Sequence, residues 1–338
     1  MDKKKLTIAR LAELAGVSKA TASLVMNGKA GQYRIADETR ERVMAVARRY
    51  QYQPNLHARA LGSRRSHTLG LVIPDLTNFG FASIAKSLES RCRQAGLQLL
   101  IACSDDDPEL EQQVVAGLVQ RQVDALIVAS SASDDAVYRQ LTERLPVIQL
   151  DRHIGQSTLP LVISDACRAT AELVQSMALG QEAVYFLGGQ LALSPSRHRL
   201  AGYELGLQRA GIEARPEWIW MADYRPVSGY CMMEQLHREL GRLPGALFTA
   251  SFTLLEGVLR YLNEHHLLAE PIRLGTFDDH ELLDCLPIAV DAVAQDCEAL
   301  AGAAFELCSL LLQGETPVQA AHVVPTRVHW RSRAQREA

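Results

Sequence analysis

From Leu69 onward the sequence alternates short apolar runs with amphipathic segments, and this alternation limits the possible folds more than any other feature. Seven runs have the length of buried strands: LGLVIP, LQLLIAC, DALIVAS, PVIQLD, AVYFLGG, GALFTAS and IRLGTF. Buried parallel strands form near-continuous apolar runs because helices cover both faces of their sheet. Seven strands over about 270 residues exceed what one compact sheet usually carries. We therefore predict two doubly wound, parallel-sheet α/β lobes with a cleft between them.

The N-terminal part is organised differently, because its apolar residues recur at helical spacing. Thr7 and Ser18 are good N-caps, and Gly16 leaves only a tight turn between the two helices that they begin. Asp37 begins a third helix, with apolar residues on one side and arginines on the other. Residues 7–50 are therefore predicted to form an all-α unit of three helices.

The overall formal charge of −4 conceals a division along the chain. Residues 1–65 contain 14 Lys and Arg against 5 Asp and Glu, a net charge of +9, which leaves 21 against 34, or −13, for the rest. A compact basic segment attracts nucleic-acid phosphates, whereas an acidic body is repelled by the same polyanion. Double-stranded DNA is therefore the partner that we expect for the N-terminal part.

The segment LTIARLAELAGVSKATASLVMNG has the spacing of a helix-turn-helix, in which the second helix presents its exposed face to the major groove. A solvated helical hairpin is the alternative, which the basic flanks and the short turn disfavour. Ala22 and Val25 are expected in the core of this unit. The residues expected nearest the bases are Lys19, Ala20 and Leu24, and those nearer the phosphates are Ser18, Thr21, Ser23 and Asn27.

A linker, QYQPNLHARALGSRRSHT, separates the two parts. Pro54 blocks continuation of the third helix, and residues 55–61 can form a short helix of their own. We therefore predict a helix-turn-helix headpiece at 1–53, a hinge at 54–66 and an α/β core at 67–338.

Three strings carry a resemblance to a known family: GVSKATASLVMNG at the second helix, TRERVMAVARRYQYQPN after it, and GLVIPDL at the first core strand. Over essentially its entire length the chain resembles the lactose-repressor family of transcription regulators. The resemblance implies a periplasmic-binding-protein-like core, with one lobe at about 67–163 plus 295–325 and the other at about 164–294. It also implies a homodimer on a pseudo-palindromic operator, released by a small ligand, that regulates sugar and central carbon metabolism.

Within that family, the resemblance is strongest to the fructose-responsive branch. The strings that carry it are NGKAGQYRIAD, LGLVIPDL, LLIACSDD, LVQRQVDALIV, LFTASFTLLEGV and GTFDDHELLD. They imply a phosphosugar effector, with fructose 1-phosphate first and a different sugar or sugar phosphate as the alternative. Whether such a regulator represses or activates depends on where its operator lies, so both outcomes stay open.

The family also implies a role for the linker. Residues 55–61, which begin with Asn55, are expected to become helical only in the dimer on DNA. Leu61 is expected to wedge into the central minor-groove step, which bends the duplex. Ala58, on the same helical face, is small enough to let two such helices approach each other. An ordinary apolar linker residue is the alternative for Leu61.

The expected effector-binding residues lie at or just beyond strand carboxyl ends, where open α/β sheets bind ligands. The family resemblance assigns this role to Asp75, Asp151, Arg152, Arg197, Ser251, Phe252 and Asp278. Carboxylates suit sugar hydroxyls, and the two arginines can hold a phosphate through charge-assisted hydrogen bonds. Ser251 and Phe252 replace an Asn-Asp pair that many sugar-responsive members carry, so hydroxyl-binding groups are lost and an aromatic ring is gained.

Several other classes of protein are disfavoured. No run approaches the roughly 18 apolar residues of a membrane-spanning helix, and the polar start lacks a secretory core, so we expect a cytoplasmic protein without a membrane partner. Motifs of metalloproteases, serine hydrolases and nucleotide-binding loops are absent, so neither an enzyme, a metal nor a cofactor is expected. The seven cysteines lack any CxxC spacing.

A transport-type sugar-binding protein is a further competitor, since it shares a two-lobed cleft, but the basic headpiece argues against it. The short tail after Trp330 has no heptad run that would form a tetramerising coiled coil. A dimer is therefore favoured over a tetramer.

Overall fold

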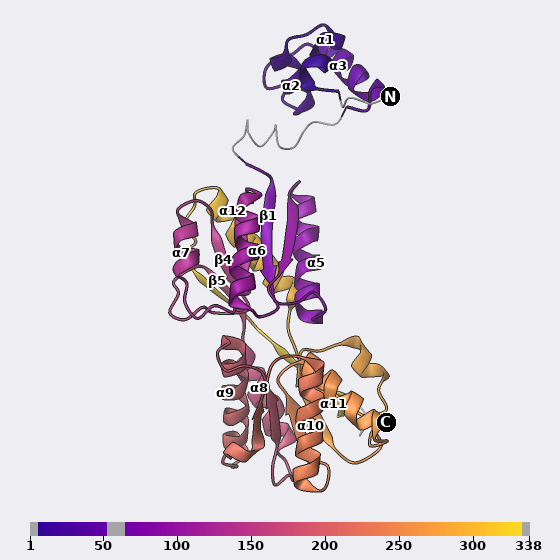
Figure 1. Ribbon diagram of the computed structural model, residues 1–338, viewed down its shortest axis with the longest axis vertical. Helices are drawn as coiled ribbons and strands as arrows, with labels where there is room; N and C mark the ends of the chain where they lie inside the picture. The colour runs from indigo at the N-terminus through magenta and orange to yellow at the C-terminus, as the bar shows by residue number, and fades with distance from the viewer. Residues whose placement is uncertain (1–5, 53–64, 333–338) are drawn as a thin grey trace. The chain divides into compact units, whose positions relative to one another are not determined.

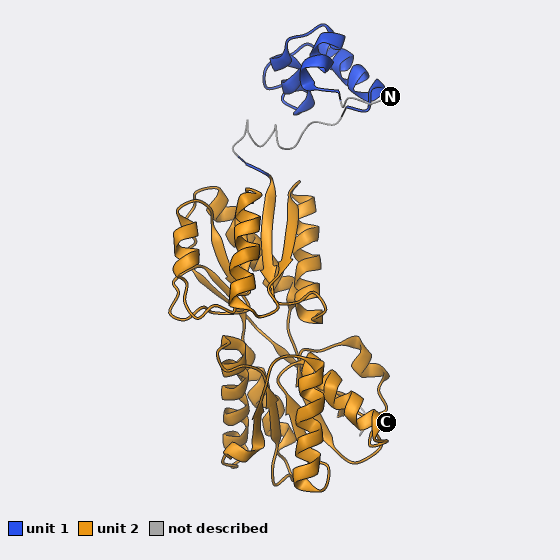
Figure 2. Ribbon diagram, in the orientation of Figure 1, with its two compact units in different colours: residues 1–66 blue, residues 67–338 orange. Residues whose placement is uncertain are grey.

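The computed structural model describes residues 6–52 and 65–332. The chain forms two compact units, Met1–Ser66 and His67–Ala338, which are called the headpiece and the core below (Figure 2). The headpiece is helical and the core contains two parallel-sheet lobes, so the predicted fold class is confirmed. The predicted hinge residues Asn55, Ala58 and Leu61 lie outside the described residues.

The headpiece contains the three predicted helices, α1 (Ile8–Ala15), α2 (Lys19–Met26) and α3 (Asp37–Arg49). Thr7 and Ser18 cap α1 and α2, because their side-chain oxygens accept hydrogen bonds from Arg10 N at 3.3 Å and Thr21 N at 3.0 Å. Gly16 adopts the left-handed conformation with φ 65°, which ends α1 without strain. The capping residues seen in the sequence therefore set the helix-turn-helix geometry.

A small apolar core joins the three helices. Ala22 and Val25 of α2 are buried as predicted, and Val43 and Ala47 of α3 pack against them. Arg42 adds a polar connection, since its Nε donates to Ala15 O at 3.0 Å and satisfies the carboxyl end of α1. The opposite face of α2 is left for contact with a partner.

The core contains two six-stranded sheets of the same topology. In the first lobe the strand order is β11-β5-β4-β3-β1-β2, and every pairing is parallel. Its strands are β1 (Thr68–Ile73), β2 (Gln98–Cys103), β3 (Ala125–Val128), β4 (Val147–Leu150), β5 (Leu161–Ser164) and β11 (Ala321–Val324). Helices α5 (Phe79–Gln94) and α12 (Cys297–Leu312) cover one face, and α6 (Pro108–Gln120) and α7 (Ala136–Thr142) the other (Figure 1).

The second lobe repeats this arrangement with the order β12-β10-β9-β8-β6-β7. Its strands are β6 (Tyr185–Gly188), β7 (Ile219–Met221), β8 (Ala246–Thr249), β9 (Arg273–Phe277), β10 (Val290–Ala294) and the antiparallel β12 (Arg327–His329). Helices α8 (Ala166–Met177) and α9 (Ser194–Arg209) cover one face, and α10 (Pro226–Leu240) and α11 (Phe252–Glu264) the other. Two short 3₁₀ helices, η1 (Pro216–Trp218) and η2 (Glu281–Cys285), precede β7 and β10.

All seven predicted strand runs are strands, but five further strands were missed. The edge strands β7 and β12 have only three residues each, and Asp291 interrupts the apolar run of β10. β11 is largely exposed and β5 has only four residues, so neither has a long apolar run. β12 pairs with β10, which places residues after 325 in the second lobe, beyond the predicted lobe boundaries.

The chain crosses between the lobes three times, at residues 164–166, 294–297 and 324–327. Thr326 Oγ1 donates to Asp165 O at 2.6 Å, so the first and third crossings are hydrogen-bonded to each other. These crossings are the covalent connections through which the lobes can reorient.

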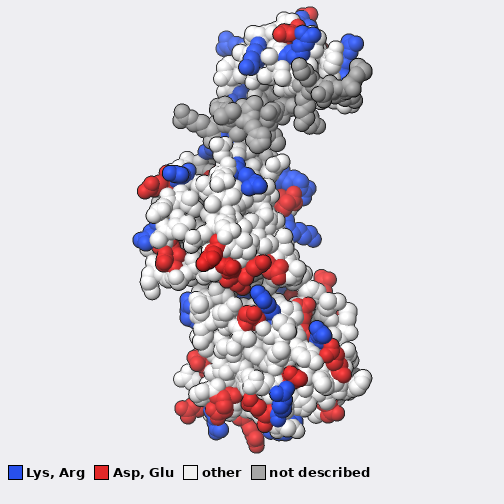
Figure 3. Space-filling model, viewed as in Figure 1, with Lys and Arg blue, Asp and Glu red and all other residues white. Residues whose placement is uncertain are grey.

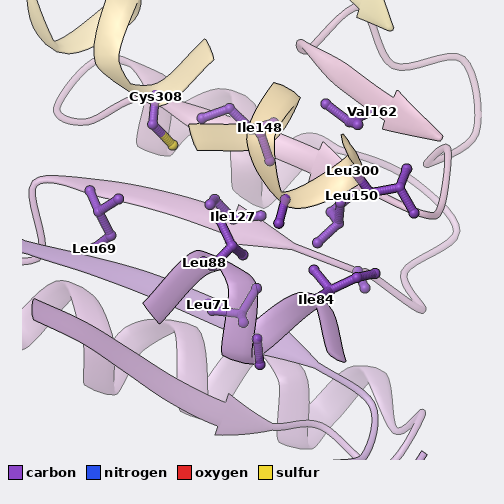
Figure 4. Packing of buried hydrophobic residues seen from close by; sticks show 14 of the residues in the cluster. Leu69, Leu71, Ile84, Leu88, Ile127, Ile148, Leu150, Val162, Leu300 and Cys308 are labelled. Atoms are coloured by element: carbon purple, nitrogen blue, oxygen red, sulfur yellow. The ribbon is translucent and has the colours of Figure 1, made fainter. Parts of the chain in front are cut away.

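The first lobe is held by an apolar layer between its sheet and the helices α5 and α12 (Figure 4). Leu69 and Leu71 from β1 and Ile127 from β3 are fully buried there, against Leu88 of α5 and Leu300 of α12. Each such side chain contributes about 1.5–3 kcal/mol on removal from water. The layer therefore fixes α5, whose first turn borders the cleft described below.

In the second lobe, two glycines let α9 lie close to α8. A Cβ at Gly202 would lie 2.7 Å from Cys167 O, and one at Gly206 would lie 2.7 Å from Ala171 O. Both acceptors are backbone atoms of α8, so they cannot move aside easily. The close packing sets the position of α9 and of the side chains at its N-terminal end.

We expect Gly206→Ala to lower the free energy of unfolding by about 1–3 kcal/mol, because its methyl group would overlap α8. Gly117→Ala on α6 is the matched control. Its new methyl group would meet only the far end of Arg121, at 3.5 Å, so the helix-propensity gain of about 0.5–1 kcal/mol should raise stability. Urea unfolding followed by circular dichroism measures both changes, and a stable Gly206→Ala protein would contradict the packing argument.

Candidate effector cleft and DNA-binding surface

A cleft lies between the two lobes, and both lobes line it. The space inside the cleft, including its open mouth, is about 670 Å³. The polar residues that line it are Asp75, Asn78, Asp106, Asp151 and Arg152 from the first lobe, Arg199, Tyr224, Ser251, Thr253 and Asp278 from the second, and Gln295 from a crossing segment.

Two of the carboxylates occupy equivalent places in the two sheets. Asp151 directly follows β4 and Asp278 directly follows β9, each the third strand in its sheet. Both residues adopt left-handed backbone conformations, with φ 63° and 71°. For a residue other than glycine this costs roughly 1–2 kcal/mol, which aspartate tolerates better than most. The strain is stored where the carboxylates enter the cleft.

Three helices begin at the cleft. Gly80 in the first turn of α5, Pro195 in that of α9 and Thr253 in that of α11 all line it. Asn78 and Ser251 cap two of these helices through Oδ1 and Oγ. Helix N-termini carry partial positive charge and free N–H groups, so their convergence favours an anionic ligand group.

Arg199 is a buried cation of the cleft. Its Nη1 donates to Ala250 O at 2.6 Å, and its guanidinium lies 3.9 Å from the centre of the Phe277 ring. Burial alone would lower the pKa of Arg199, but Tyr224, Asp278 and Asp151 more than compensate, so its pKa is raised. The Nε atom is buried and has no hydrogen-bond partner within the described residues. The side chain therefore stays charged and keeps an unused donor.

Arg152 is the second cation. Its Nη1 donates to Asp106 at 2.5 Å, while its Nε is buried and lacks a hydrogen-bond partner in the described part of the chain. Burial raises the pKa of Asp151, although Arg199 and Arg152 act in the opposite direction. Because polar groups that are buried without partners are costly, both arginines are suited to a ligand that supplies acceptors.

Five of the seven predicted effector residues line the cleft: Asp75, Asp151, Arg152, Ser251 and Asp278. Arg197 does not, because it is exposed and its Nη1 donates to Leu191 O at 2.8 Å and Ala192 O at 2.7 Å. Two residues further along the helix, about 200° around its axis, Arg199 points into the cleft instead. Arg199 lies on the same helical face as Gly202 and Tyr203, so the helical spacing of these residues in the sequence could have identified Arg199 as the inward-facing arginine.

Phe252 also lies outside the cleft lining, where it forms part of an aromatic contact. Its ring stacks on His280 with centroids 4.7 Å apart, and Phe79 of the first lobe meets the same imidazole at 4.3 Å. Two hydrogen bonds also join the lobes, from Asn78 Nδ2 to Thr253 Oγ1 at 3.3 Å and from His153 N to Ser194 Oγ at 2.8 Å. The cleft is thus bounded by direct contacts between the lobes.

Besides Arg199, sequence reasoning missed Asn78, Asp106, Tyr224, Thr253 and Gln295 among the polar lining residues. Asn78 is an N-cap, a signal that the sequence contains, whereas Gln295 directly follows β10, a strand that the sequence did not reveal. Tyr224 lies in a loop, where only the folded chain shows its approach to the cleft.

The predicted DNA-contacting residues of the headpiece occupy the face of α2 away from its core. Lys19 and Ala20 are exposed, Leu24 is half-buried, and the remaining residues are exposed or half-buried, namely Ser18, Thr21, Ser23 and Asn27. Figure 3 shows Lys and Arg side chains over the visible face of the headpiece, and Asp and Glu side chains gathered on the core where its lobes meet. The arrangement agrees with the charge division in the sequence.

Comparison with known families identifies both units. The headpiece matches the model described as bacterial regulatory proteins, lacI family, over residues 7–55. Residues 66–238 match periplasmic binding proteins and sugar binding domain of LacI family, and residues 175–332 match a periplasmic binding protein-like domain. The chain belongs to the LacI family. It is therefore a DNA-binding regulator of the kind that controls sugar operons.

Individual LacI-family relatives are similar in sequence to this protein over nearly the whole chain. The sucrose operon repressor of Klebsiella pneumoniae is 51% identical over 98% of this chain and 99% of its own. The fructose operon regulatory protein of Vibrio cholerae is 40% identical over 89% and 93%. These relatives are transcription regulators and not enzymes.

Solved structures show the same fold. The Cra transcriptional dual regulator of Pseudomonas putida, in complex with fructose 1-phosphate, is 36% identical with a TM-score of 0.74, covering 78% of this chain and 98% of that one. A lac repressor dimer bound to operator and an anti-inducer is 26% identical with a TM-score of 0.83, covering 96% and 98%.

Two further properties concern the described residues alone. None of their helices has the length and apolar character needed to span a membrane. Their His, Cys, Asp and Glu side chains form no group of three that is suited to a metal ion.

The raised pKa of Asp151 predicts how stability depends on pH. The folded chain binds this proton more tightly than the unfolded chain, so the contribution of Asp151 to wild-type stability should fall as pH rises from the ordinary value of 3.8 through the raised pKa. Asp151→Asn lacks this titration, so its stability relative to wild type should increase over the same pH window and then level off. Thermal unfolding at several pH values measures the difference.

Glu172→Gln on α8 is the control, because this carboxylate is exposed. Its stability difference from wild type should stay nearly constant with pH. A pH-independent difference for Asp151→Asn would mean that burial does not penalise the Asp151 carboxylate.

Proposed function

We propose that this protein is a dimeric LacI-family regulator whose grip on its operator is released by a phosphosugar in the cleft, with fructose 1-phosphate as the first candidate. The observation that carries the effector proposal is the pair of buried arginines, Arg199 and Arg152. Each lies beside cleft carboxylates and has an Nε without a hydrogen-bond partner among the described residues. Such a site offers acceptors for sugar hydroxyls and donors for an anionic group on one molecule.

One relative, which was solved with a phosphosugar, supports the same ligand class. A sucrose operon repressor and a fructose operon regulatory protein share 51% and 40% of their residues with this chain, and a 36% identical regulator has been solved with fructose 1-phosphate. The helix N-termini of α5, α9 and α11 add partial positive charge on the cleft wall, which favours a phosphate. We therefore place the phosphate toward these N-termini and the sugar hydroxyls toward Asp151 and Asp278.

An uncharged sugar, such as free fructose, is a second candidate. Four carboxylates line the cleft, from Asp75, Asp106, Asp151 and Asp278, against two arginines. This excess of negative charge opposes a phosphate dianion and suits hydroxyl groups. Binding of the free sugar with equal affinity would favour this candidate.

For DNA we propose that two headpieces occupy the half-sites of a pseudo-palindromic operator, and that residues 54–66 form the hinge. The 26% identical lac repressor, solved as a dimer on its operator, supports this arrangement. On α2 the proposed base contacts are Lys19, Ala20 and Leu24, while Leu61 would enter the minor groove.

Release follows from linkage. A ligand that binds one arrangement of the lobes more tightly shifts the protein toward it. If DNA prefers the other arrangement, the ligand and the operator must weaken each other by the same factor. The two lobe-to-lobe hydrogen bonds and the Phe79–His280 contact are the interactions that such a reorientation must change.

Calorimetric titration tests the effector directly. We expect micromolar binding of fructose 1-phosphate, weaker binding of fructose and fructose 6-phosphate, and loss of operator binding only with the ligand that binds. Arg199→Met should weaken binding by at least tenfold, because the guanidinium lies in the cleft. Arg197→Met is the matched control on the exposed face and should bind like wild type. Equal losses in both variants would contradict the assignment to Arg199.

Lys19→Ala tests the DNA surface. We expect its affinity for an operator selected from random DNA to fall about tenfold, while its affinity for a scrambled duplex changes little, because a lost base contact costs about 1–3 kcal/mol. Lys86→Ala removes the same charge from α5 of the core and should leave both affinities unchanged. Fluorescence anisotropy measures them at fixed salt. A similar loss on both duplexes would assign Lys19 to phosphate contact.

A further inference from the structure

Gln295 lies where the cleft meets a crossing segment. It directly follows β10 of the second lobe and precedes α12 of the first, and its side chain lines the cleft. Its Nε2 donates to Asp278 Oδ1 at 2.5 Å, and its Oε1 accepts from Ser164 Oγ at 2.6 Å. One amide thus joins a cleft carboxylate to a serine of the first crossing segment.

We infer that the hydrogen-bonded chain Ser164–Gln295–Asp278 is a relay that couples ligand occupancy of the cleft to the relative orientation of the lobes. The inference rests on the proposed function, because it assigns residues to the step in which the ligand weakens operator binding. Gln295 and Ser164 act in it as positioning residues.

The chemistry of the chain gives it a defined direction. A carboxylate can only accept hydrogen bonds, so the amide nitrogen must face Asp278 and the amide oxygen must face Ser164. Both bonds are largely shielded from water, since Ser164 is 8% exposed and Asp278 is 9% exposed. In such an environment, leaving a polar group without its hydrogen bond costs more free energy than at the surface. When the Asp278 carboxylate shifts, the Gln295 amide and the Ser164 hydroxyl are therefore expected to move with it.

The far end of the relay reaches the segments that must move. Ser164 is the last residue of β5, and the next residue, Asp165, accepts from Thr326 of the third crossing at 2.6 Å. Gln295 itself belongs to the second crossing. All three covalent connections between the lobes therefore meet at one hydrogen-bonded cluster.

The near end of the relay contacts both walls of the cleft. A Cβ at Gly80, in the first turn of α5, would lie 3.9 Å from Gln295 Nε2, so the amide borders the first lobe. Asp278 belongs to the second lobe and is held in a left-handed conformation with φ 71°. Gln295 donates to the Asp278 carboxylate, and a sugar hydroxyl in the cleft would donate to the same carboxylate. A ligand that shifts this carboxylate therefore also shifts Gln295, which lies in the crossing between the lobes.

Ser164→Ala is the decisive variant, because Ser164 does not line the cleft while Gln295 does. We expect its affinity for fructose 1-phosphate, measured by calorimetry, to stay within about twofold of wild type. The factor by which a saturating ligand weakens operator binding, measured by anisotropy, should fall at least fivefold. Gln295→Met should lose this factor as well and should also bind the ligand more weakly.

A double variant and a matched control complete the design. Ser164→Ala combined with Gln295→Met should reduce the release factor no further than Gln295→Met alone, because both substitutions break one chain. Ser309→Ala removes a hydroxyl that donates within its own helix, to Phe305 O at 2.8 Å, and should keep the wild-type release factor.

The possible outcomes separate the relay from the proposed function. If the ligand weakens operator binding by the same factor in the wild type and in Ser164→Ala, the relay is overturned and the proposed function stands. Additive effects of Ser164→Ala and Gln295→Met would also overturn it. A wild-type protein whose operator affinity is unchanged by fructose 1-phosphate, fructose, fructose 6-phosphate and sucrose would overturn the proposed function and the relay with it.

Discussion

The parallel pairing of the strands is the constraint on which the rest of the core depends. Eleven of the twelve described strands pair in parallel, and only β12 is antiparallel. In each sheet the carboxyl ends of the parallel strands, and the N-termini of the helices that follow them, therefore lie at the same end of the sheet. Polar residues directly after β4, β9 and β10 therefore arrive at the same cleft from distant parts of the sequence. In open α/β sheets, ligands bind in the crevice outside the carboxyl ends of the strands.

The second organising feature is the burial of two arginines among carboxylates. Arg199 and Arg152 are both buried beside Asp278, Asp151 and Asp106, so the hydration that their guanidinium groups lose must be replaced by partners. The part of the chain that the structure describes replaces it only incompletely, since the Nε of each guanidinium has no hydrogen-bond partner there. A ligand can supply the acceptors that these two guanidinium groups lack. Because the groups lie where the two lobes meet, ligand binding there connects the electrostatics of the cleft to the movement of the lobes.

Much of the fold could be predicted because its signals are local. Seven apolar runs identified seven strands, and the caps at Thr7 and Ser18 and the turn at Gly16 identified the helix-turn-helix. The strands that escaped prediction are short, exposed or interrupted, so their stability comes from pairing with neighbours and not from their own apolar run. For the cleft, the family resemblance assigned seven residues, of which five line it; it selected Arg197 in place of Arg199, and the two differ in helical phase.

The sequence by itself determined the class of protein, the basic headpiece and the acidic two-lobed core, because charge, caps and apolar periodicity act over a few neighbouring residues. Only the tertiary structure decided which side chains meet. It turned Arg199 inward and Arg197 outward, brought Tyr224 from a loop into the cleft, and joined Ser164, Gln295 and Asp278 across 131 and 17 residues of sequence. Those meetings depend on how close α9 lies to α8 and on where the chain crosses between the lobes, and both are set by packing between distant segments.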